Sequence, residues 1–440
     1  MSPRQHVLKL LDRWEKSDAY ADILLEKLFD QKKISTQDRA LIQEIFFGVI
    51  RWRKRLDWII EQFFQGSIKK SPRFVRQILQ SSLYQLIYLD RIPSYAIINE
   101  AVKIAKFKGG RYWSGKINAI LRNFLNNQNK LEFPDISKTP VEAISIQYSF
   151  PRWIVERWIK RWGVNETIAL CTANNKRPQI TLRVNSSKIK PQKFEEKLSE
   201  LNVKVASSKY SENFYRADTL PTLSQFKLFQ QGYFSIQDES AGLACQLLQP
   251  EPGETIIDLC AAPGGKTAYL TELSKNKAII FSVDQNFSRL KFVGDGLKRP
   301  GFSISRLIQG DARNFSCKLV DKIIVDVPCS GLGVIAKRVD LRWRRKQEQI
   351  GELIKIQLDI LRNAASLVKS GGAIVYSTCT IEPEENEEII TKFLSENKQF
   401  KIDSAKKYVP EIFTTGEGYV YTFPHKHGID GSFAVRLQKR

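Results

Sequence analysis

The feature that most limits the fold of this chain is the alternation of two kinds of segment over residues 236–440. Short apolar segments rich in β-branched residues alternate with longer segments whose apolar residues recur every three or four positions, as on one face of a helix. Strands and helices in this order bury their apolar faces as βαβ units, with parallel strands in one sheet and helices on both sides. We therefore predict a doubly wound α/β domain. The expected strands are ETIIDLC (254–260), AIIFSVD (278–284), ISRLIQGD (304–311), DKIIVDVP (321–328), GAIVYSTCT (372–380) and GSFAVRLQ (431–438).

Residues 1–132 have a different pattern, in which one amphipathic segment follows another. Asp38 and Ser71-Pro72 suit helix starts, and Pro93 separates two helices. This pattern predicts an all-helical domain with short loops. The helical segments are AYADILLEKLF (19–29), DRALIQEIFFGVIRWRKRLDWIIEQFF (38–64), VRQILQSSLYQLIYL (75–89) and SYAIINEAVKIAKF (94–107).

The region between these two, residues 133–235, mixes both kinds of segment. After a connector that contains proline, IVERWIKRW (154–162) predicts a short amphipathic helix. We expect a small α+β module to follow. Its strand–helix–strand order is carried by QITLRVN (179–185), FEEKLSELN (194–202) and VKVASS (203–208). The predicted domains are therefore residues 1–132, 133–235 and 236–440.

The chain carries a formal net charge of +22, with a sequence pI near 9.6. A surface this basic attracts polyanions, and nucleic-acid backbones are the commonest of them. Residues 51–130 contain 16 Lys or Arg and four Asp or Glu, and residues 101–130 contain no acid. This clustering favours a nucleic-acid-binding face over a generally basic, soluble protein. Charged residues interrupt the N-terminal segment too early for a signal peptide, and no run of 18 apolar residues occurs. Both observations favour a cytoplasmic protein without a membrane anchor.

Six cysteines bear on metal and redox chemistry. None forms a Cys-x-x-Cys pair, and the chain has only three histidines, so we expect no metal site. In a cytoplasmic chain the thiols stay reduced. Each is then either a small buried apolar residue or a reactive group. The cysteines are Cys171, Cys245, Cys260, Cys317, Cys329 and Cys379.

The motif DLCAAPGGKT (258–267) follows a predicted strand and opens a helix, where ligands bind in doubly wound sheets. Small residues in it let the backbone approach a ligand closely. The GKT ending also suits a phosphate-binding P-loop. That pattern needs a glycine five positions before the second one, where Cys260 stands, so we disfavour it. The small residues are Ala261, Ala262, Gly264 and Gly265.

Two acidic residues follow the next two predicted strands. Asp284, in SVDQNFSR, suits a ribose diol because a carboxylate can accept hydrogen bonds from two hydroxyl groups. Asp311, in QGDAR, occupies the corresponding place after the following strand and suits a nucleoside with an exocyclic amine. Either acid alone also fits a solvated position at a strand end.

Two cysteines lie at predicted strand ends as well. DVPCSGLGV (326–334) places Asp326 and Cys329 in one loop, and YSTCTIEPEENE (376–387) places Cys379 after another strand. A buried structural cysteine is the ordinary alternative for each. Two cysteines beside acids and small residues favour a reactive pair. The acidic residues that suit the start of the following helix are Glu384 and Glu385.

Two cysteines beside acidic residues are the groups that methyl transfer to carbon 5 of cytosine requires. That carbon is a poor nucleophile, and addition of a thiolate to carbon 6 turns it into an enamine carbon that can attack a sulfonium methyl group. An acid near ring nitrogen 3 stabilises the developing charge, and a base removes the carbon 5 proton before the thiol leaves. The residues alone leave open whether Cys329 or Cys379 is the nucleophile.

The motifs DLCAAPGGKT, VDQN, GDAR, DVPCSG and STCT occur in the order typical of RNA cytosine-C5 methyltransferases, and the chain resembles that family over essentially its whole length. Its N-terminal helices resemble a NusB-like RNA-binding domain. A NusB-like domain, a small RRM-like module and a Rossmann-like class I methyltransferase domain match the bacterial 16S ribosomal RNA subgroup. The resemblance implies S-adenosylmethionine (SAM) as cofactor. It also implies 16S ribosomal RNA as the substrate. We expect a monomer without a membrane partner. We also expect it to act on free RNA or a partly assembled small subunit, because both are more accessible than a finished ribosome.

The resemblance also implies a function for individual residues. Asp284 would hold the ribose hydroxyls of SAM, and Asp311 would face its adenine. Asp326 would lie between the cofactor and the target base as the acid near N3. Cys379 would be the nucleophile and Cys329 would assist product release, whereas DNA cytosine-C5 methyltransferases use the Pro-Cys cysteine as nucleophile. The implied SAM-site residues are Cys260, Ala261, Ala262, Pro263, Gly264, Gly265, Lys266, Asp284, Asp311 and Asp326.

A basic and aromatic stretch, AKRVDLRWRRKQ (336–347), follows the motif DVPCSGLGV. Its mixture of Arg, Lys and Trp343 suits phosphate contact and base stacking, and the alternative is a solvated basic loop. HGIDGSF (427–433) is expected to be structural. Two other functions stay open: a non-catalytic RNA-binding factor, and an enzyme of the same fold that acts on transfer RNA or on another base.

Overall fold

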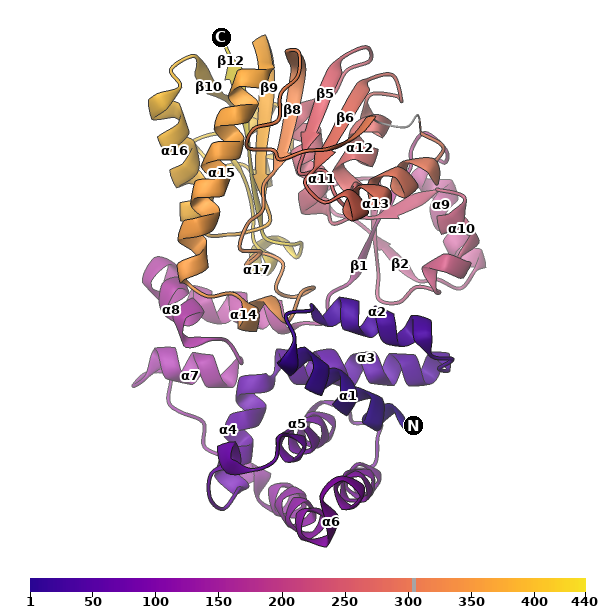
Figure 1. Cartoon of the computed structure of the whole chain (residues 1–440), viewed down its shortest axis with the longest axis vertical. Coiled ribbons are helices and arrows are strands. Elements are labelled where there is room, and N and C mark those ends of the chain that lie inside the picture. The colour runs from indigo at the N-terminus through magenta and orange to yellow at the C-terminus, as the bar shows by residue number, and fades with distance from the viewer. Residues whose placement is uncertain (303–305) are drawn as a thin grey trace. The chain divides into compact units, whose positions relative to one another are not determined.

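The computed structural model describes residues 1–302 and 306–440. Contacts between residues divide the chain into two compact units (Figure 1). The helical unit comprises residues 1–175 and 337–344, and the sheet unit comprises residues 176–336 and 345–440. We call residues 337–344 the strap, because this short segment leaves the sheet unit to join the helical one.

The helical unit packs its helices around one central helix, α5 (Arg73–Tyr88), which contacts α1, α3, α4 and α6. Apolar residues at helical spacing in α1 to α6 form one core. Among the described residues, no helix of the chain is long and apolar enough to cross a membrane. The other helices are α1 (Pro3–Lys16), α2 (Ala21–Gln31), α3 (Thr36–Arg51), α4 (Arg53–Phe63), α6 (Ser94–Asn127), α7 (Pro140–Gln147), α8 (Arg152–Asn175) and α14 (Leu341–Arg344).

The helix boundaries differ from those predicted in places where local capping decides. Segment 38–64 is two helices, because Trp52 leaves helical geometry at φ −101° and ψ 15°. Helix α3 starts before Asp38, since the Ser35 hydroxyl caps it by accepting a hydrogen bond from the Asp38 amide. The helix predicted as short, IVERWIKRW, continues through a kink at Gly163 (φ 79°) as part of α8.

The strap completes the helical unit. Val339 is 2% exposed and belongs to the core of this unit, and Trp343 packs against the same core. The strap is also fixed at α2, where the Ala21 amide donates to Asp340 Oδ2 (2.8 Å). A segment that follows the motif DVPCSGLGV in sequence therefore supplies part of the helical fold.

The smaller sheet of the sheet unit is antiparallel, in the order β2-β3-β1-β4, and packs against helix α9 (Pro191–Glu200). The predicted strand–helix–strand order is present as β1, α9 and β2. Two strands that the sequence pattern did not predict complete the sheet. The strands are β1 (Ile180–Val184), β2 (Val205–Ser207), β3 (Phe214–Ala217) and β4 (Phe234–Ile236).

The larger sheet confirms the doubly wound domain and adds an antiparallel edge. Its strand order among the described residues is β10-β12-β9-β8-β5-β6-β7, with β11 beside β12. Strands β5 to β9 run parallel, whereas β10, β11 and β12 pair antiparallel, so the predicted all-parallel sheet is mixed. The beginning of the predicted strand 304–311 lies outside the described residues. The strands are β5 (Thr255–Leu259), β6 (Ile279–Asp284), β7 (Arg306–Gln309), β8 (Val320–Asp326), β9 (Val368–Thr378), β10 (Phe400–Asp403), β11 (Val420–Thr422) and β12 (Ser432–Lys439).

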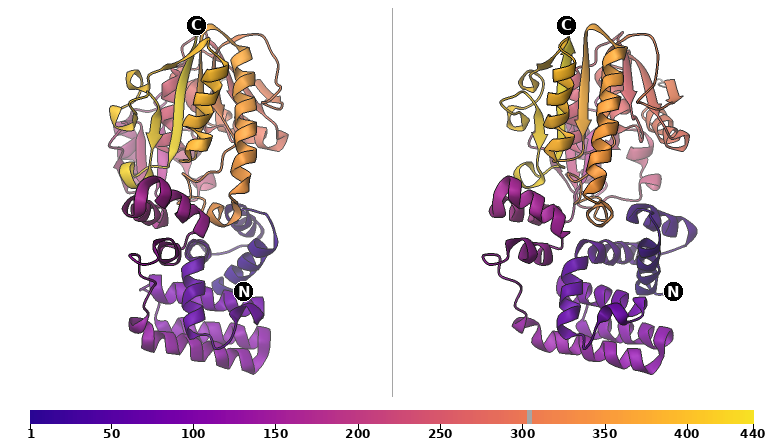
Figure 2. Two further views of the ribbon diagram at one scale, coloured as in Figure 1. Left: turned by 90° about the vertical axis from the view of Figure 1, so that its left-hand side faces the viewer. Right: turned by 60° about the vertical axis from the view of Figure 1, so that its left-hand side comes forward.

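Both faces of this sheet are covered. Because successive strand residues point to opposite sides, Ile257 packs in a core with helices α15 (Glu348–Leu367) and α16 (Glu387–Glu396). Ile256 packs on the other side with α11 (Glu239–Leu248) and α12 (Gly265–Leu273). Figure 2 shows α15 and α16 running along the strands on one face. The edge formed by the carboxyl ends of the parallel strands stays available for loops that carry chemistry.

Candidate active site

The register of the parallel strands brings four predicted motifs to one edge of the sheet. Leu259 at the end of β5 pairs with Val283 of β6 and Val325 of β8. Asp326 at the end of β8 pairs with Ser377 of β9. The loops that begin at Cys260, Asp284, Asp326 and Cys379 therefore leave the sheet side by side, although up to 119 positions separate them in the chain.

The first loop, residues 260–264, makes a sharp turn from β5 into α12. Cys260 has a left-handed backbone (φ 65°), and Gly264 has φ 101°. A Cβ atom on Gly264 would lie 2.7 Å from the Cα of Val293 in α13 (Phe287–Lys298). Glycine is thus required at position 264 for two reasons: the left-handed backbone conformation and the close approach of α13. The turn points the first amides of α12 toward the edge of the sheet, where a helix start favours a polar ligand.

The carboxylate of Asp284 ties this loop to the end of β6. It accepts hydrogen bonds from the amides of Ala262 (3.1 Å) and Asn286 (2.9 Å), and the residue is 5% exposed. The guanidinium of Arg289 donates to the Ala262 carbonyl (2.8 Å). Each carboxylate oxygen keeps a lone pair for a further donor such as a ribose hydroxyl.

Asp258, within β5, is a buried acid that the sequence pattern did not single out. The Thr267 hydroxyl donates to its Oδ2 (2.6 Å), but its Oδ1 has no hydrogen-bond partner among the described residues. Burial raises the pKa of Asp258 to about 7, against the opposing effects of the Thr267 hydrogen bond and the charge of Lys266. No sequence signal marks this residue, because a strand-end aspartate looks the same whether it is buried or solvated.

Lys266 and Asp326 form an ion pair across two strand ends, with Nζ and Oδ2 2.6 Å apart. The Ser377 hydroxyl donates to the other oxygen of Asp326 (3.1 Å). Burial lowers the pKa of Lys266, but the charge of Asp326 and its hydrogen bond outweigh burial, so the net shift is upward. The ammonium is therefore committed to a carboxylate, unlike the lysine of a P-loop, which points at phosphates.

The side chains of the two predicted site cysteines, Cys329 and Cys379, are in contact. Cys329 Sγ and Cys379 Sγ lie 3.1 Å apart, and the Cys379 amide approaches Cys329 Sγ at 3.3 Å. Cys329 is buried, whereas Cys379 is partly exposed. The hydrogen bond to Cys379, together with burial, raises the pKa of Cys329 well above its ordinary value. The thiol form of Cys329 is therefore favoured, and it can donate to Cys379 Sγ.

Three side chains fix the loop that carries Cys329. Glu385 accepts from the Ser330 amide (2.8 Å), and Gln357 donates to both the Pro328 carbonyl (3.0 Å) and Glu385 (2.9 Å). Arg345 donates to the carbonyls of Ser330 (2.9 Å) and Cys329 (3.1 Å). The loop is thus held on both sides by hydrogen bonds to its backbone.

Glu384 and Glu385, the acids expected at a helix start, lie in a short 3-10 helix (Pro383–Glu385) directly before α16, and Glu385 has a further function that the sequence did not indicate. Helix α16 begins only at Glu387, and Glu385 is fully buried with its carboxylate turned to Ser330 and Gln357. Burial raises its pKa, opposed by these hydrogen bonds. An acid-rich segment before a helix is typical of dipole pairing, and the sequence does not reveal that the Cys329 loop needs an acceptor at this point.

The glycines of DVPCSGLGV and HGIDGSF pack against each other. A Cβ atom on Gly333 would lie 2.9 Å from the Cys379 carbonyl oxygen and far closer than that to the Gly431 carbonyl. The Gly333 amide donates to the Cys379 carbonyl (3.1 Å), and the Gly431 amide to the Gly333 carbonyl (2.9 Å). HGIDGSF thus has the structural function expected of it, because Gly431 supports the backbone that carries Cys379.

Asp311 follows β7. Among the described residues, it takes no part in the hydrogen bonds that connect the other predicted site residues. It forms an ion pair with Arg313 (2.6 Å) and accepts from Gln285 (3.3 Å). The hydrogen bonds from Arg313 lower the pKa of Asp311. Its carboxylate remains ionised and one-quarter exposed at the end of the sheet edge.

The prediction that the stretch 336–347 offers stacking and phosphate contacts is wrong for its central residues. Arg342 has no exposed surface and donates to the carbonyls of Arg51, Ser149 and Asn174 (each 3.3 Å) and to Asn175 Oδ1 (2.8 Å). The Trp343 indole donates to the Ile50 carbonyl (2.7 Å). These side chains hold the strap in the helical unit, and a basic, aromatic composition is compatible with either function.

Comparison with known proteins matches each part of the chain to a described family. Residues 1–126 match the NusB family, residues 150–214 the ferredoxin-like domain of RsmF/B-like methyltransferases, and residues 245–438 the family "16S rRNA methyltransferase RsmB/F".

Whole proteins and solved structures resemble the chain over its full length. A "probable ribosomal RNA small subunit methyltransferase B" from Synechocystis is 35% identical, with all of both chains covered. One of the same name from Bacillus subtilis is 34% identical, over all of this chain and 99% of its own. The crystal structure of PH0851 is similar with a TM-score of 0.82 and 27% identity, over all of this chain and 99% of that one.

Proposed function

Because the chain belongs to the RsmB/F family of 16S rRNA methyltransferases, and is therefore a SAM-dependent methyltransferase of small-subunit ribosomal RNA, we propose that it methylates carbon 5 of one cytosine in 16S ribosomal RNA through a covalent adduct with Cys379. The observation that carries this proposal is the pair of thiols 3.1 Å apart beside Asp326. Methyl transfer to a nitrogen or an oxygen needs no cysteine nucleophile, whereas carbon 5 of a pyrimidine does.

The loop after β5 and the acids at the neighbouring strand ends fit a bound SAM. The backbone of residues 260–265 would line the nucleoside, and Asp284 has free lone pairs for the ribose hydroxyls. Asp311, at the end of the sheet edge, would face the adenine, and Asp326 with its partner Lys266 would lie between cofactor and target base. When bound, SAM supplies an electrophilic methyl group.

The thiolate of Cys379 would form a bond to carbon 6 of the cytosine as the C5–C6 double bond opens. Asp326, acting as the acid, would deliver a proton to ring nitrogen 3 as negative charge moves there, and would take it back when the adduct collapses. Carbon 5 then has the electron density to take the methyl group. A base removes the proton from carbon 5, the Sγ–C6 bond breaks, and the thiolate of Cys379 is regenerated. Cys329, whose raised pKa keeps it protonated, is suited to donate a hydrogen bond to that leaving thiolate and so to assist product release.

Residues 1–132 and 133–235 would position the RNA, and residues 236–440 would carry out the reaction. The target cytosine must leave its stack to reach the thiol pair, so a loop or a helix end is the favoured substrate. We propose that the enzyme acts in the cytoplasm as a monomer, on free 16S RNA or on a partly assembled small subunit.

The test compares wild-type, Cys379→Ala and Cys329→Ala proteins with labelled SAM and unmodified 16S RNA on denaturing gels. We expect label in the RNA for the wild type and none for Cys379→Ala. Cys329→Ala should accumulate a protein–RNA adduct, because release fails after methylation. Cys317→Ala, at an exposed thiol outside the site, serves as the control and should resemble the wild type.

Other outcomes would identify a different function. Activity in Cys379→Ala, with loss of activity and no adduct in Cys329→Ala, would make Cys329 the nucleophile. Label in total transfer RNA but not in 16S RNA would change the substrate. Binding of RNA without binding of SAM would leave a non-catalytic RNA-binding factor.

A further inference from the structure

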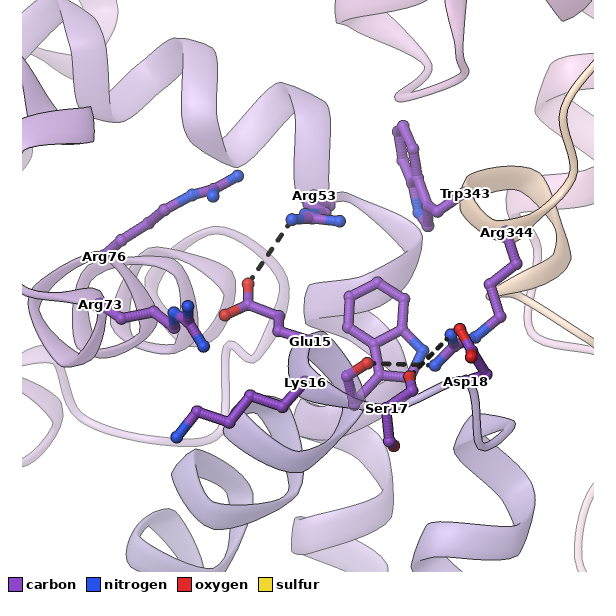
Figure 3. A pocket seen from close by; sticks show the side chains of 10 residues that line it. Glu15, Lys16, Ser17, Asp18, Arg53, Arg73, Arg76, Trp343 and Arg344 are labelled. Atoms are coloured by element: carbon purple, nitrogen blue, oxygen red, sulfur yellow. Dashed lines mark hydrogen bonds and ion pairs between the residues drawn. The ribbon is translucent and has the colours of Figure 1, made fainter.

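The helical unit contains a polar cavity of about 420 Å³ that none of the proposed SAM-site or catalytic residues lines. The end of α1, the loop that follows it, the starts of α4 and α5, and the strap form its walls. Figure 3 shows charged side chains converging on it from these separate elements. The lining residues are Trp14, Glu15, Lys16, Ser17, Asp18, Arg53, Arg73, Arg76, Trp343 and Arg344.

Positive charge is in excess in this cavity, with five basic and two acidic side chains among its lining residues. The pKa of Arg53 is lowered by burial and then by the charge of Arg76, against the attraction of Asp57 and Glu15. An anion in the cavity would therefore relieve both the desolvation and the mutual repulsion of the guanidinium groups.

The cations differ in how fully the protein already uses them. Arg344 donates to the carbonyls of Trp14, Ser17 and Ala19, and Arg76 is held by Asp57. In contrast, the ion pairs of Arg53 with Glu15 (3.5 Å) and of Arg73 with Asp12 (4.0 Å) are long, and both guanidinium groups keep exposed surface. Arg53 and Arg73 thus have donors to offer to a ligand.

Two tryptophans line the cavity, and their surroundings indicate which part of a nucleic acid fits. Trp343 packs against the core of the helical unit, and its indole donates to the Ile50 carbonyl (2.7 Å). The guanidinium carbons of Arg53 and Arg344 lie 5.2 and 5.3 Å from the centre of the Trp14 ring. These cations already cover the indole, so a nucleobase could not stack on it without displacing an arginine. A phosphate group, which binds arginine through paired hydrogen bonds, needs no such displacement.

We infer that this cavity binds a phosphodiester of the substrate RNA backbone, with Arg53 and Arg73 as the phosphate ligands and Lys16 at its rim. The inference rests on the proposed function for the identity of the polyanion. It assigns the helical unit a sequence-independent contact that anchors the RNA, because phosphate contacts fix position and carry no base preference.

The experiment measures the affinity of full-length protein for 16S RNA between 50 and 300 mM salt, and methylation at saturating RNA. The variants are Arg53→Gln and Arg73→Gln, with Arg73→Lys as the conservative form. Arg91→Gln is the matched control, since Arg91 is exposed in the same unit but outside the cavity. Thermal melting of each variant establishes that the fold is intact.

We expect each Gln variant to bind RNA about 3- to 10-fold more weakly and to lower the slope of log affinity against log salt by about one, as the loss of one phosphate contact requires. Arg73→Lys should keep most of the affinity, and Arg91→Gln all of it. Methylation at saturating RNA should stay near the wild-type rate.

Unchanged affinity and slope in both Gln variants would overturn the inference, as would an equal loss in Arg91→Gln, which would indicate general charge attraction. Failure of the proposed function gives a different result. A wild-type protein that binds 16S RNA through Arg53 and Arg73 but transfers no methyl group would refute the proposed reaction and leave the phosphate site standing.

Discussion

At the scale of single residues, Asp258 has the clearest thermodynamic consequence. Its pKa is raised by burial to about 7 in the folded chain, against about 4 when unfolded. Between these values the folded state binds a proton that the unfolded state has lost, so the contribution of Asp258 to stability is present below pH 4 and falls as the pH rises to 7. The total loss is on the order of 4 kcal/mol.

Asp258→Asn should remove this dependence, because an amide cannot ionise and its oxygen can still accept from Thr267. The variant should gain stability over the wild type as the pH rises from 5 to 8, as measured by urea unfolding at each pH. Asp321→Asn is a control of opposite sign, because the hydrogen bond from Lys369 lowers the pKa of Asp321. Parallel profiles for Asp258→Asn and the wild type would contradict the buried, protonated acid.

The residues at the edge of the sheet could be predicted from sequence to the extent that motif position fixes them. Asp326, Cys329 and Cys379 lie at or next to the carboxyl ends of predicted strands, and the carboxyl ends of parallel strands meet at one edge. Glu385 and Arg345, which hold the Cys329 loop, could not be predicted. Their function depends on loop conformation and burial, and neither property produces a periodic pattern in the sequence.

At the scale of elements, the turn from β5 into α12 depends on Gly264. Gly264→Ala would force a side chain into the left-handed region and bring its Cβ to 2.7 Å from the backbone of α13. We expect a loss of about 3 kcal/mol or more in unfolding free energy, and weaker SAM binding by calorimetry as α12 shifts from α13.

Gly253→Ala is the matched control for this change. Gly253 also has a left-handed backbone (φ 88°), but a Cβ atom there meets nothing within 4 Å. The control should lose only about 1 kcal/mol, and SAM affinity should not change. Equal losses at both positions would mean that backbone strain alone, and not the packing of α13, requires Gly264.

Element type was predicted better than element extent. Short apolar segments identified the strands of the parallel sheet, because these strands are buried on both faces. Helical periodicity identified the helices of the N-terminal region, because each buries one face. It did not show that segment 38–64 breaks at Trp52 or that α8 continues past Gly163. The short strands β3 and β4, and the antiparallel β10 and β11, have too few residues for periodicity to reveal them.

At the scale of the whole molecule, the strap joins segments that the sequence separates widely. Arg342 contacts the carbonyl of Arg51, 291 positions away, in a fully buried site. Burial and the charge of Arg51 lower its pKa to about 9. No local pattern could predict such a contact, because its partners are backbone carbonyls, which every residue has.

Arg342→Ala should destabilise the helical unit strongly, since four acceptors would lose their donor in a buried place. We expect about 3 kcal/mol or more, measured by chemical unfolding and by faster proteolysis within α8. Arg338→Ala, at an exposed position of the same strap, should change stability by less than about 0.5 kcal/mol. A similar small effect at both positions would show that the strap docks without Arg342.

The strap also limits how this protein could have been assembled during evolution. A genetic exchange that replaced residues 1–175 alone would keep the old strap but remove the partners of Val339, Arg342 and Trp343 in the helical unit. The two units are thus not interchangeable modules. Each change in the helical core must be matched by a change in eight residues encoded more than 150 codons downstream, so the two stretches of gene are expected to be inherited and to diverge together.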